Sequence, residues 1–336
     1  ALQQAAYDQL VGPGYEGSAV AIQPSTGKIL AMASNPGYNP NDLMGDSAEE
    51  TWANLQEQEG QPLVNHAGAE TLPPGSIFKI ITTAAGLNNG FDPSSTLTGS
   101  NVITLPDTVT ELTNYANQKC NGQDAVTLQT AFALSCNTAF VEMSEQLGAD
   151  ELRKYAKAFG VGENYDLGVS TSAGTLGDLP DGAATAQSAI GQRDVTMTAL
   201  QAAVMAGTVA NKGTRMQPYL VNRITDAQMK DIRTTKPKKA DQAVNEETAA
   251  TLTDLMYASE RSSAGYDGNG FASKTGTAEH GEGLAPHVWY VAFDPERDIA
   301  VGVVVKNGGN LGESATGGKV SGPIGRAILR AYQGEQ

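Results

Sequence analysis

The chain has 336 residues, of which 40% are hydrophobic, enough for one large domain or two with a sizeable core. Its formal net charge of −15 argues against a nucleic-acid partner, and the one basic run, residues 233–239, is typical of a solvated loop. No apolar stretch approaches the roughly 20 residues needed to span a bilayer, and the first residues do not resemble a signal peptide. We therefore expect the chain to be soluble as given, with any membrane anchor outside these residues.

The N-terminal segment predicts one helix and one pair of strands. Residues 1–12 have the spacing of a short amphipathic helix. Residues 18–22 and 29–33 are apolar and are joined by a tight turn, which indicates a buried antiparallel pair. A polar stretch follows, with a helical turn expected at residues 51–57.

The next segment predicts a serine nucleophile. Two prolines and Gly75 form a rigid entry to an apolar run with the length and alanine content of a buried helix, so Ser76 should lie in its first turn. Lys79, three residues on, should then share a face with Ser76. A serine hydroxyl is a weak nucleophile until a base removes its proton, and a neighbouring lysine with a lowered pKa can act as that base. A second Ser-x-x-Lys begins at Ser25, but it falls in the turn between two strands, so we favour Ser76.

The middle of the chain predicts mainly helices. Residues 87–126 are rich in turn-forming residues, with one short strand expected at residues 101–105. Helical spacing follows, with Asn137 a candidate cap, over residues 127–133, 138–147, 149–159 and 198–211.

The last third returns to strands. A strand is expected at residues 216–224 and a helix at 245–259, followed by three core strands at 270–277, 287–293 and 299–305 and a final helix at about 320–332. The order predicts an α/β (α+β) fold, in which a central, mainly antiparallel sheet is flanked by the N- and C-terminal helices and carries an inserted all-α subdomain. We place the sheet subdomain at approximately residues 1–70 and 215–336, and the α-rich subdomain at approximately residues 71–214.

A second polar cluster, Ser135-Cys136-Asn137, lies where two predicted helices meet. A second hydroxyl can relay a proton between a lysine and a leaving amine, and the Asn137 amide offers a donor and an acceptor to a peptide backbone. For such a tripeptide alone, capping of the second helix is the more common role.

A third cluster, Lys274-Thr275-Gly276-Thr277, ends a predicted strand. A cation here would lower the pKa of Lys79 and attract a carboxylate, which the hydroxyls of Thr275 and Thr277 would bind. Gly276 would let an extended substrate lie against the strand edge. The backbone N–H of Thr277, facing that of Ser76, would form an oxyanion hole. Alone, the tetrapeptide is more often a turn with a surface lysine.

In this order, the three clusters resemble those of class A β-lactamases and penicillin-binding proteins. Over nearly its whole length the chain resembles the transpeptidase domain of a class B, transpeptidase-only penicillin-binding protein, with further similarity at residues 27–34, 39–41, 73–76 and 189–192 and at Trp289. The resemblance implies a peptidoglycan stem peptide ending in D-Ala-D-Ala as substrate. Ser76 would attack the penultimate carbonyl, and an amine of a neighbouring stem peptide would resolve the acyl-enzyme into a cross-link. β-Lactams would acylate the same serine.

The same resemblance implies the setting of the protein. We expect no metal and no organic cofactor, and an extracytoplasmic location at the cell-envelope face of a bacterial plasma membrane. An N-terminal anchoring helix would lie outside these residues. A membrane glycosyltransferase of the division or elongation machinery would be a partner.

Cys120 and Cys136 are the only cysteines, which excludes a disulfide-dense scaffold and a cysteine-rich zinc site. They could pair with each other or remain two buried free thiols. The extracytoplasmic location that the resemblance implies favours the disulfide.

Other functions stay open on the sequence. A D,D-carboxypeptidase or a slow serine β-lactamase would use water in place of the acceptor amine, but residues 161–177 offer only Glu163 as a glutamate to activate it, outside a Glu-x-x-Leu-Asn motif. A non-catalytic β-lactam or muropeptide sensor would need a partner domain elsewhere. A Ser-His-Asp hydrolase is disfavoured because no Gly-x-Ser-x-Gly elbow accompanies the three histidines, His66, His280 and His287.

Overall fold

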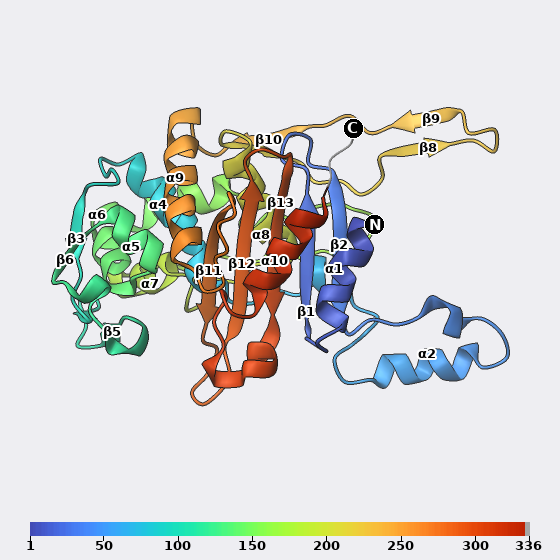
Figure 1. Cartoon of the computed structure of the whole chain (residues 1–336), viewed down its shortest axis with the longest axis horizontal. Coiled ribbons are helices and arrows are strands. Elements are labelled where there is room, and N and C mark those ends of the chain that lie inside the picture. The colour runs from blue at the N-terminus through green and yellow to red at the C-terminus, as the bar shows by residue number, and fades with distance from the viewer. Residues whose placement is uncertain (333–336) are drawn as a thin grey trace.

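A computed structural model describes residues 1–332, and its centre is one five-stranded antiparallel sheet. The strand order β11-β12-β13-β1-β2 brings both ends of the chain into one sheet (Figure 1). Strand β1 pairs with β13 along the whole length of β1, from Gly17 opposite Val305 to Ile22 opposite Ala300. The strands are β1 (Gly17–Ile22), β2 (Ile29–Asn35), β11 (Ala272–Ala278), β12 (His287–Asp294) and β13 (Ile299–Val305).

Helices cover both faces of this sheet, which explains why β12 and β13 are almost continuously apolar. Helices α1 (Leu2–Val11) and α10 (Ser321–Ala331) pack on one face, and α8 (Ala199–Ala210) packs on the other (Figure 1). Gly302 in β13 lets α8 approach closely, because a Cβ there would lie 2.5 Å from the backbone nitrogen of Ala203. The predicted α+β class, with a mainly antiparallel sheet flanked by the terminal helices, is confirmed.

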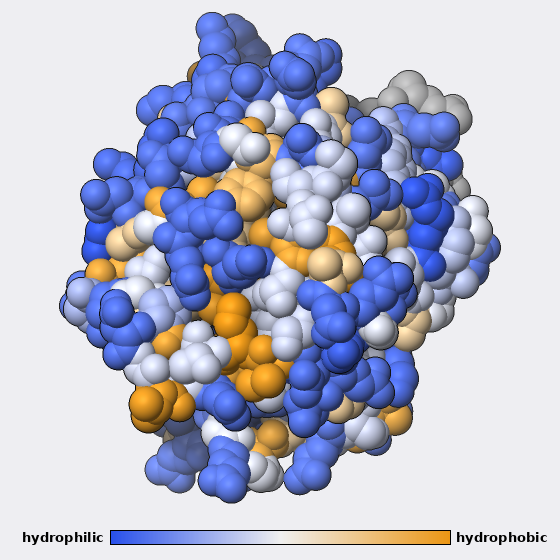
Figure 2. Space-filling view, turned by 90° about the vertical axis from the view of Figure 1, so that its left-hand side faces the viewer, coloured by the Kyte–Doolittle hydropathy of each residue, from blue (hydrophilic) through white to orange (hydrophobic). Residues whose placement is uncertain are grey.

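Five further helices form an α-rich end beside β11 (Figure 1). Gly148 interrupts α6 with a non-helical backbone, which matches the predicted break between two helices. Figure 2 looks onto this end and shows apolar residues gathered near its centre among hydrophilic ones. These helices are α4 (Lys79–Leu87), α5 (Leu128–Leu134), α6 (Asn137–Ala158), α7 (Gly182–Ala189) and α9 (Glu246–Ser262), of which α7 was not predicted.

Four small two-stranded sheets complete the strands of the described residues. Among residues 1–332 no helix has both the length and the apolar character that a bilayer crossing requires. Two segments project past β2: the one that carries helix α2, and the β8–β9 hairpin (Figure 1). The bounds are β3 (Thr96–Thr98), β4 (Val102–Thr104), β5 (Glu111–Thr113), β6 (Ala125–Thr127), β7 (Thr214–Met216), β8 (Arg223–Thr225), β9 (Asp231–Thr234), β10 (Lys239–Gln242), α2 (Ala48–Glu57) and the short α3 (His66–Ala69).

Two local predictions need correction. The strand expected at residues 216–224 is wrong, because β7 ends at Met216 and β8 begins at Arg223. Pro218 between them has no N–H to give to a ladder, which disfavours a continuous strand. The basic run at 233–239 is almost wholly exposed, as expected, but its two ends belong to β9 and β10 rather than to a loop throughout.

Candidate active site

Ser76 lies in a single 3-10 turn, η2 (Gly75–Phe78), that leads directly into α4. In a 3-10 turn residues three apart are eclipsed, so Lys79 stands directly over Ser76. The Lys79 Nζ atom is 3.0 Å from the Ser76 Oγ atom. The three-residue spacing therefore brings the predicted nucleophile and its predicted base together, as expected.

Neighbouring segments hold this turn from two sides. The Trp289 indole on β12 donates to the carbonyl of Pro73 over 2.8 Å, and the Gly75 N–H donates to the carbonyl of Gly191 over 3.0 Å. Gly75 has a φ of +54°, and a Cβ on Gly191 would lie 2.1 Å from the Gly75 oxygen. Glycine is thus required at both positions by backbone conformation and close approach.

Lys79 is the meeting point of the first two predicted clusters. Its side chain is fully buried, and its Nζ atom donates to the Ser135 carbonyl (2.9 Å), the Ser135 Oγ (3.2 Å) and the Asn137 Oδ1 (2.7 Å). The Phe140 ring lies 5.3 Å from the same nitrogen. Residues more than 50 positions apart in the sequence therefore converge on one amine.

Asn137 does not cap α6. The N-cap is Cys136, and the Asn137 side chain instead accepts from Lys79 and donates to the carbonyl of Thr113. The capping interpretation of the Ser135-Cys136-Asn137 cluster is therefore wrong, since the amide is committed to the site. Ser135 ends α5 in the left-handed region, with a φ of 61° and a ψ of 44°.

Lys274 is fully buried on β11, with its Nζ atom 3.1 Å from the Thr275 carbonyl and 5.7 Å from the centre of the Phe132 ring. Burial lowers the pKa of Lys274 to about 7. Burial also lowers the pKa of Lys79 well below its ordinary value, and the charge of Lys274 lowers it further, as the sequence predicted.

The remaining residues of the third cluster lie on the outer strand of the sheet, against the Ser76 turn. A Cβ on Gly276 would lie 2.8 Å from the Pro74 oxygen and 3.3 Å from the Ile77 nitrogen. Gly276 is therefore needed for the packing of β11 on this turn, a reason that the sequence did not reveal. Thr275 and Thr277 are half-buried, and β11 forms one edge of the five-stranded sheet, where no further strand pairs with its backbone.

The histidines of the described residues have other partners. His66 contacts the Glu70 carboxylate at 3.1 Å and the carbonyls of Gly60 and Gln61 at 3.0 Å. The rings of His280 and His287 stack with their centres 3.9 Å apart. Within residues 1–332 no recorded contact joins a histidine to Ser76, which agrees with the rejection of a Ser-His-Asp hydrolase.

Sequence reasoning missed the aromatic rings that help to bury the two lysines. Phe132 lies in α5 and Phe140 in α6, both fully buried, and each sits near one lysine nitrogen. Their spacing in the chain is that of ordinary core residues, so no sequence signal distinguished them.

Comparison with known proteins assigns the family. Residues 17–330 match the model of the penicillin binding protein transpeptidase domain. The chain belongs to this family. The relative named peptidoglycan D,D-transpeptidase PbpA from Mycolicibacterium smegmatis is 45% identical over 348 residues, covering 98% of this chain and 70% of the relative. The protein of the same name from Mycobacterium tuberculosis H37Rv is 42% identical over 350 residues, covering 99% of this chain and 71% of the relative.

Solved structures of this transpeptidase family agree with the fold. The ceftriaxone acyl-enzyme complex of penicillin-binding protein A from M. tuberculosis superposes with a TM-score of 0.95 at 41% identity, covering 99% of this chain and 78% of that one. The penicillin G acyl-enzyme complex of the same protein gives a TM-score of 0.93 at 42% identity, covering 98% of this chain and 78% of that one. The resemblance to penicillin-binding proteins drawn from the sequence is confirmed.

Proposed function

We propose that the chain is a peptidoglycan D,D-transpeptidase that works through a serine acyl-enzyme at Ser76 and is inhibited by β-lactams. The observation that carries the proposal is the buried amine of Lys79, which lies 3.0 Å from the Ser76 Oγ and contacts the Ser135 and Asn137 side chains. A buried, neutral lysine beside a serine at the start of a helix is a general base and nucleophile pair.

The proposed acylation moves one proton around the site. Neutral Lys79 takes the hydroxyl proton as the Ser76 Oγ attacks the carbonyl of the penultimate D-alanine. The C–N bond then breaks, the acyl group stays on Ser76, and the proton passes from Lys79 through the Ser135 hydroxyl to the departing D-alanine amine. In the second half an amine of a neighbouring stem peptide attacks the ester, forms the cross-linking amide and returns a proton to Ser76.

The proposed substrate groups match the polar atoms of the third cluster. Lys274, Thr275 and Thr277 would bind the terminal carboxylate, and an extended stem peptide would add to the free edge of β11. The backbone N–H groups of Ser76 and Thr277 would stabilise the oxyanion. The Asn137 amide would exchange its 3.2 Å bond to Thr113 for one to the substrate backbone.

The position of Glu163 favours a long-lived acyl-enzyme over β-lactam hydrolysis. Its carboxylate is 2.6 Å from the guanidinium of the buried Arg215, and it is the only glutamate among residues 161–177. Among the described residues the recorded bond of this carboxylate is to Arg215, and no hydrogen bond joins it to Ser76, Lys79 or Ser135, so the structure places no glutamate beside Ser76 to activate a water.

Mass spectrometry after penicillin treatment tests the proposal. We expect one penicilloyl adduct per chain on the peptide that contains Ser76, and we expect it to persist after the free drug is removed. With a D-Ala-D-Ala peptide, a transpeptidase joins the donor to an added amine, whereas a carboxypeptidase gives only the hydrolysed peptide. An adduct on another residue, or one lost within minutes, would contradict the proposal.

We expect the second-order rate constant of β-lactam acylation to follow a bell-shaped pH profile. The rate rises as Lys79, whose pKa is lowered by burial and by Lys274, loses its proton and becomes a base. It falls again as Lys274, with a pKa of about 7, loses the charge that attracts the carboxylate. An arginine at position 274 stays charged at and above the pH at which Lys274 loses its proton. The Lys274→Arg variant should therefore lose the alkaline limb of the profile and keep the acidic limb. An alkaline limb that survives in this variant would assign the limb to another group.

We also propose an extracytoplasmic location at the cell-envelope face of the membrane, with an anchor outside residues 1–336 and a membrane glycosyltransferase as partner. A cross-linking enzyme needs newly made glycan strands. A glycan-polymerising reaction on the same face of the membrane must supply them. Labelling of intact cells with a membrane-impermeant β-lactam should reach Ser76. Labelling only after cell lysis would contradict this location.

A further inference from the structure

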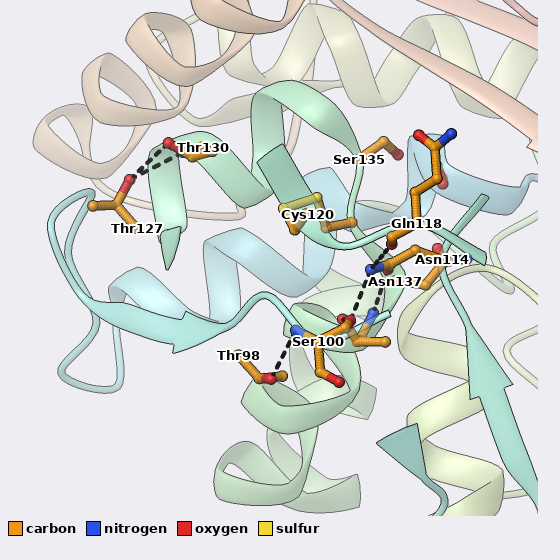
Figure 3. Close-up of a disulfide and its surroundings, with 12 residues drawn as sticks. Thr98, Ser100, Asn114, Gln118, Cys120, Thr127, Thr130, Ser135 and Asn137 are labelled. Atoms are coloured by element: carbon orange, nitrogen blue, oxygen red, sulfur yellow. Dashed lines mark hydrogen bonds between the residues drawn. A yellow bond between two sulfur atoms is a disulfide. The ribbon is translucent and has the colours of Figure 1, made fainter. Parts of the chain in front are cut away.

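Two sides of the candidate site are held in different ways. On the side of α5 and α6, a disulfide joins Cys136 to Cys120, and the Asn114 side chain donates to the backbone of the same loop (Figure 3). The structure thus shows the two cysteines paired rather than as free thiols. They are the only cysteines of the chain, so no covalent bond supports β11. The end of β11 next to Thr277 therefore depends on non-covalent contacts.

Two stacked histidines lie at this end of β11. His287, the first residue of β12, is the register partner of Ala278, the last residue of β11. His280 follows two residues after Ala278, and its ring is parallel to that of His287, with an interplanar angle of 3° and the ring centres 3.9 Å apart. The stack therefore joins the β11–β12 loop, residues 279–286, to the start of β12.

Each ring is also hydrogen-bonded to the backbone. The His280 Nε2–H donates to the Ala285 carbonyl at 2.8 Å, which ties the two ends of the loop together. The Asn307 N–H donates to the His287 Nδ1 atom at 3.2 Å, which joins β12 to the 3-10 segment η5 (Lys306–Ser314). A ring nitrogen that accepts a hydrogen bond carries no proton. The bond from Asn307 is therefore lost when His287 gains a proton on Nδ1.

The groups around the stack oppose a charge on His287. Burial lowers the pKa of His287 to about 4, and the charges of His280 and Lys306 lower it further, against the opposite effect of Glu70. Lys306 lies 2.9 Å from the Glu16 carboxylate and 2.7 Å from that of Glu70. The remaining titratable side chains of these segments are His66, which contacts Glu70, and the exposed Glu279, Glu282 and Glu313.

The same end of β11 packs on the turn that carries Ser76. A Cβ on Gly75 would lie 3.0 Å from the Thr277 oxygen and 3.1 Å from the Ala278 Cβ atom. In the proposed function, the Thr277 N–H binds the oxyanion and its hydroxyl binds the carboxylate. A shift of this strand end would therefore move both donors relative to Ser76, and a misplacement of about 1 Å can cost roughly a hundredfold in rate.

We infer that His280 and His287 are positioning residues, which hold the Thr277 end of β11 against the Ser76 turn while both rings are neutral and release it when the pair is protonated. The inference rests on the proposed function, because it concerns the donors that Thr277 would give to the substrate. Two positive rings in a stack repel each other, and the Asn307 N–H would then face a protonated nitrogen. The loop should therefore open as the pH falls.

Hydrogen exchange measures this opening without using activity. In the open form His287 would regain its ordinary pKa of 6.5, against about 4 in the closed form, so the closed form loses stability as the pH falls from about 6.5 towards 4. The amides to follow are Asn307, which donates to His287, and Leu284, which donates to the Gly281 carbonyl in the loop. We expect their exchange rates, corrected for the intrinsic rate of a free amide, to rise roughly tenfold between pH 6.5 and pH 5. Rates that do not rise in the wild type would overturn the inference.

A matched double variant separates protonation of the pair from other effects of acid. His280→Gln/His287→Asn puts an uncharged amide donor in place of Nε2–H and an amide acceptor in place of Nδ1, so it keeps both backbone bonds and takes up no proton. Its corrected exchange rates should stay within about twofold between pH 6.5 and pH 5, since without a titrating group there is no linkage to pH. An acid response equal to that of the wild type would assign the opening to another group and contradict the inference.

Stopped-flow acylation by a β-lactam measures the effect on the site. The dissociation constant of the non-covalent complex should rise in the wild type as the pH falls from 6.5 to 5, and it should stay within about twofold in the double variant. The first-order rate constant of acylation should fall in both proteins, because Lys79 gains a proton in both. A dissociation constant that rises equally in both would contradict the positioning role.

His66→Gln is the histidine control. The hydrogen bond to Glu70 raises the pKa of His66, so this ring also gains a proton in acid, but it does not belong to the stack. The variant should keep the acid response of the wild type. A response that is lost here and kept in the double variant would place the effect at His66 and overturn the inference. If the wild type were not acylated at Ser76 at all, the proposed function would fail, whereas the exchange rates would still decide whether the pair holds the loop.

Discussion

Ser76→Ala is expected to abolish covalent labelling by a fluorescent penicillin without unfolding the protein. The substitution removes only the attacking oxygen, and Lys79 keeps its three contacts with Ser135 and Asn137. One lost hydrogen bond at a half-buried position costs about 1 kcal/mol of unfolding free energy. Gel fluorescence reports the label, and thermal unfolding followed by circular dichroism reports the fold. Labelling that survives in a folded variant would place the nucleophile elsewhere.

Lys79→Ala should reduce the labelling rate by a factor of about 10²–10⁴, the usual contribution of a general base. This variant should also lose stability, because the Asn137 Oδ1 and the Ser135 carbonyl are left without the donor that satisfies them. Ser25→Ala is the matched control. Ser25 begins the other Ser-x-x-Lys and bonds to Asp298 in a surface turn, so its removal should leave labelling unchanged.

Glu260→Ala is expected to lower the unfolding free energy by about 3–5 kcal/mol, the usual result of removing one partner from a buried ion pair. Glu260 is fully buried in α9, and its carboxylate accepts from the Arg326 Nε at 2.7 Å and the Tyr290 hydroxyl at 3.0 Å. It also accepts from the Asn269 amide and the Ser273 hydroxyl. One carboxylate thus joins α9, α10, β11 and β12. In Glu260→Ala the buried guanidinium of Arg326 stays charged and loses its carboxylate partner, which destabilises the folded state.

A double variant separates the cost of an unpaired charge from the loss of packing. Glu260→Leu/Arg326→Met removes both charges and keeps apolar volume, so it should recover much of the stability that Glu260→Ala loses. Urea unfolding of the two variants and the wild type measures the difference. Exposed ion pairs contribute about 1 kcal/mol or less. A loss of unfolding free energy below about 1 kcal/mol in Glu260→Ala would therefore mean that water reaches Arg326 readily.

The sequence predicted the elements that depend on short-range interactions. The Ser76–Lys79 pair follows from three-residue spacing on one turn, and the strands of the central sheet follow from apolar and β-branched runs. The failed strand at residues 216–224 shows the limit of that reasoning, because the run contains Pro218, which disfavours a continuous strand. Helix α7 was missed because its alanine-rich residues carry no strong amphipathic pattern.

The tertiary structure alone decided how the site is built. Ser135 and Asn137 reach Lys79 only because α5 and α6 pack against neighbouring elements, and this packing overrides the capping role that Asn137 would have locally. The same packing buries Lys79 and Lys274 and so lowers the pKa of each. The burial of a side chain depends on contacts with segments far apart in the sequence. The spacing of neighbouring residues carries no information about those contacts. The sequence by itself therefore indicated the residues that we propose carry the chemistry. The fold determined the distances between them, the burial that lowers the pKa of the two lysines, and the disulfide between Cys136 and Cys120.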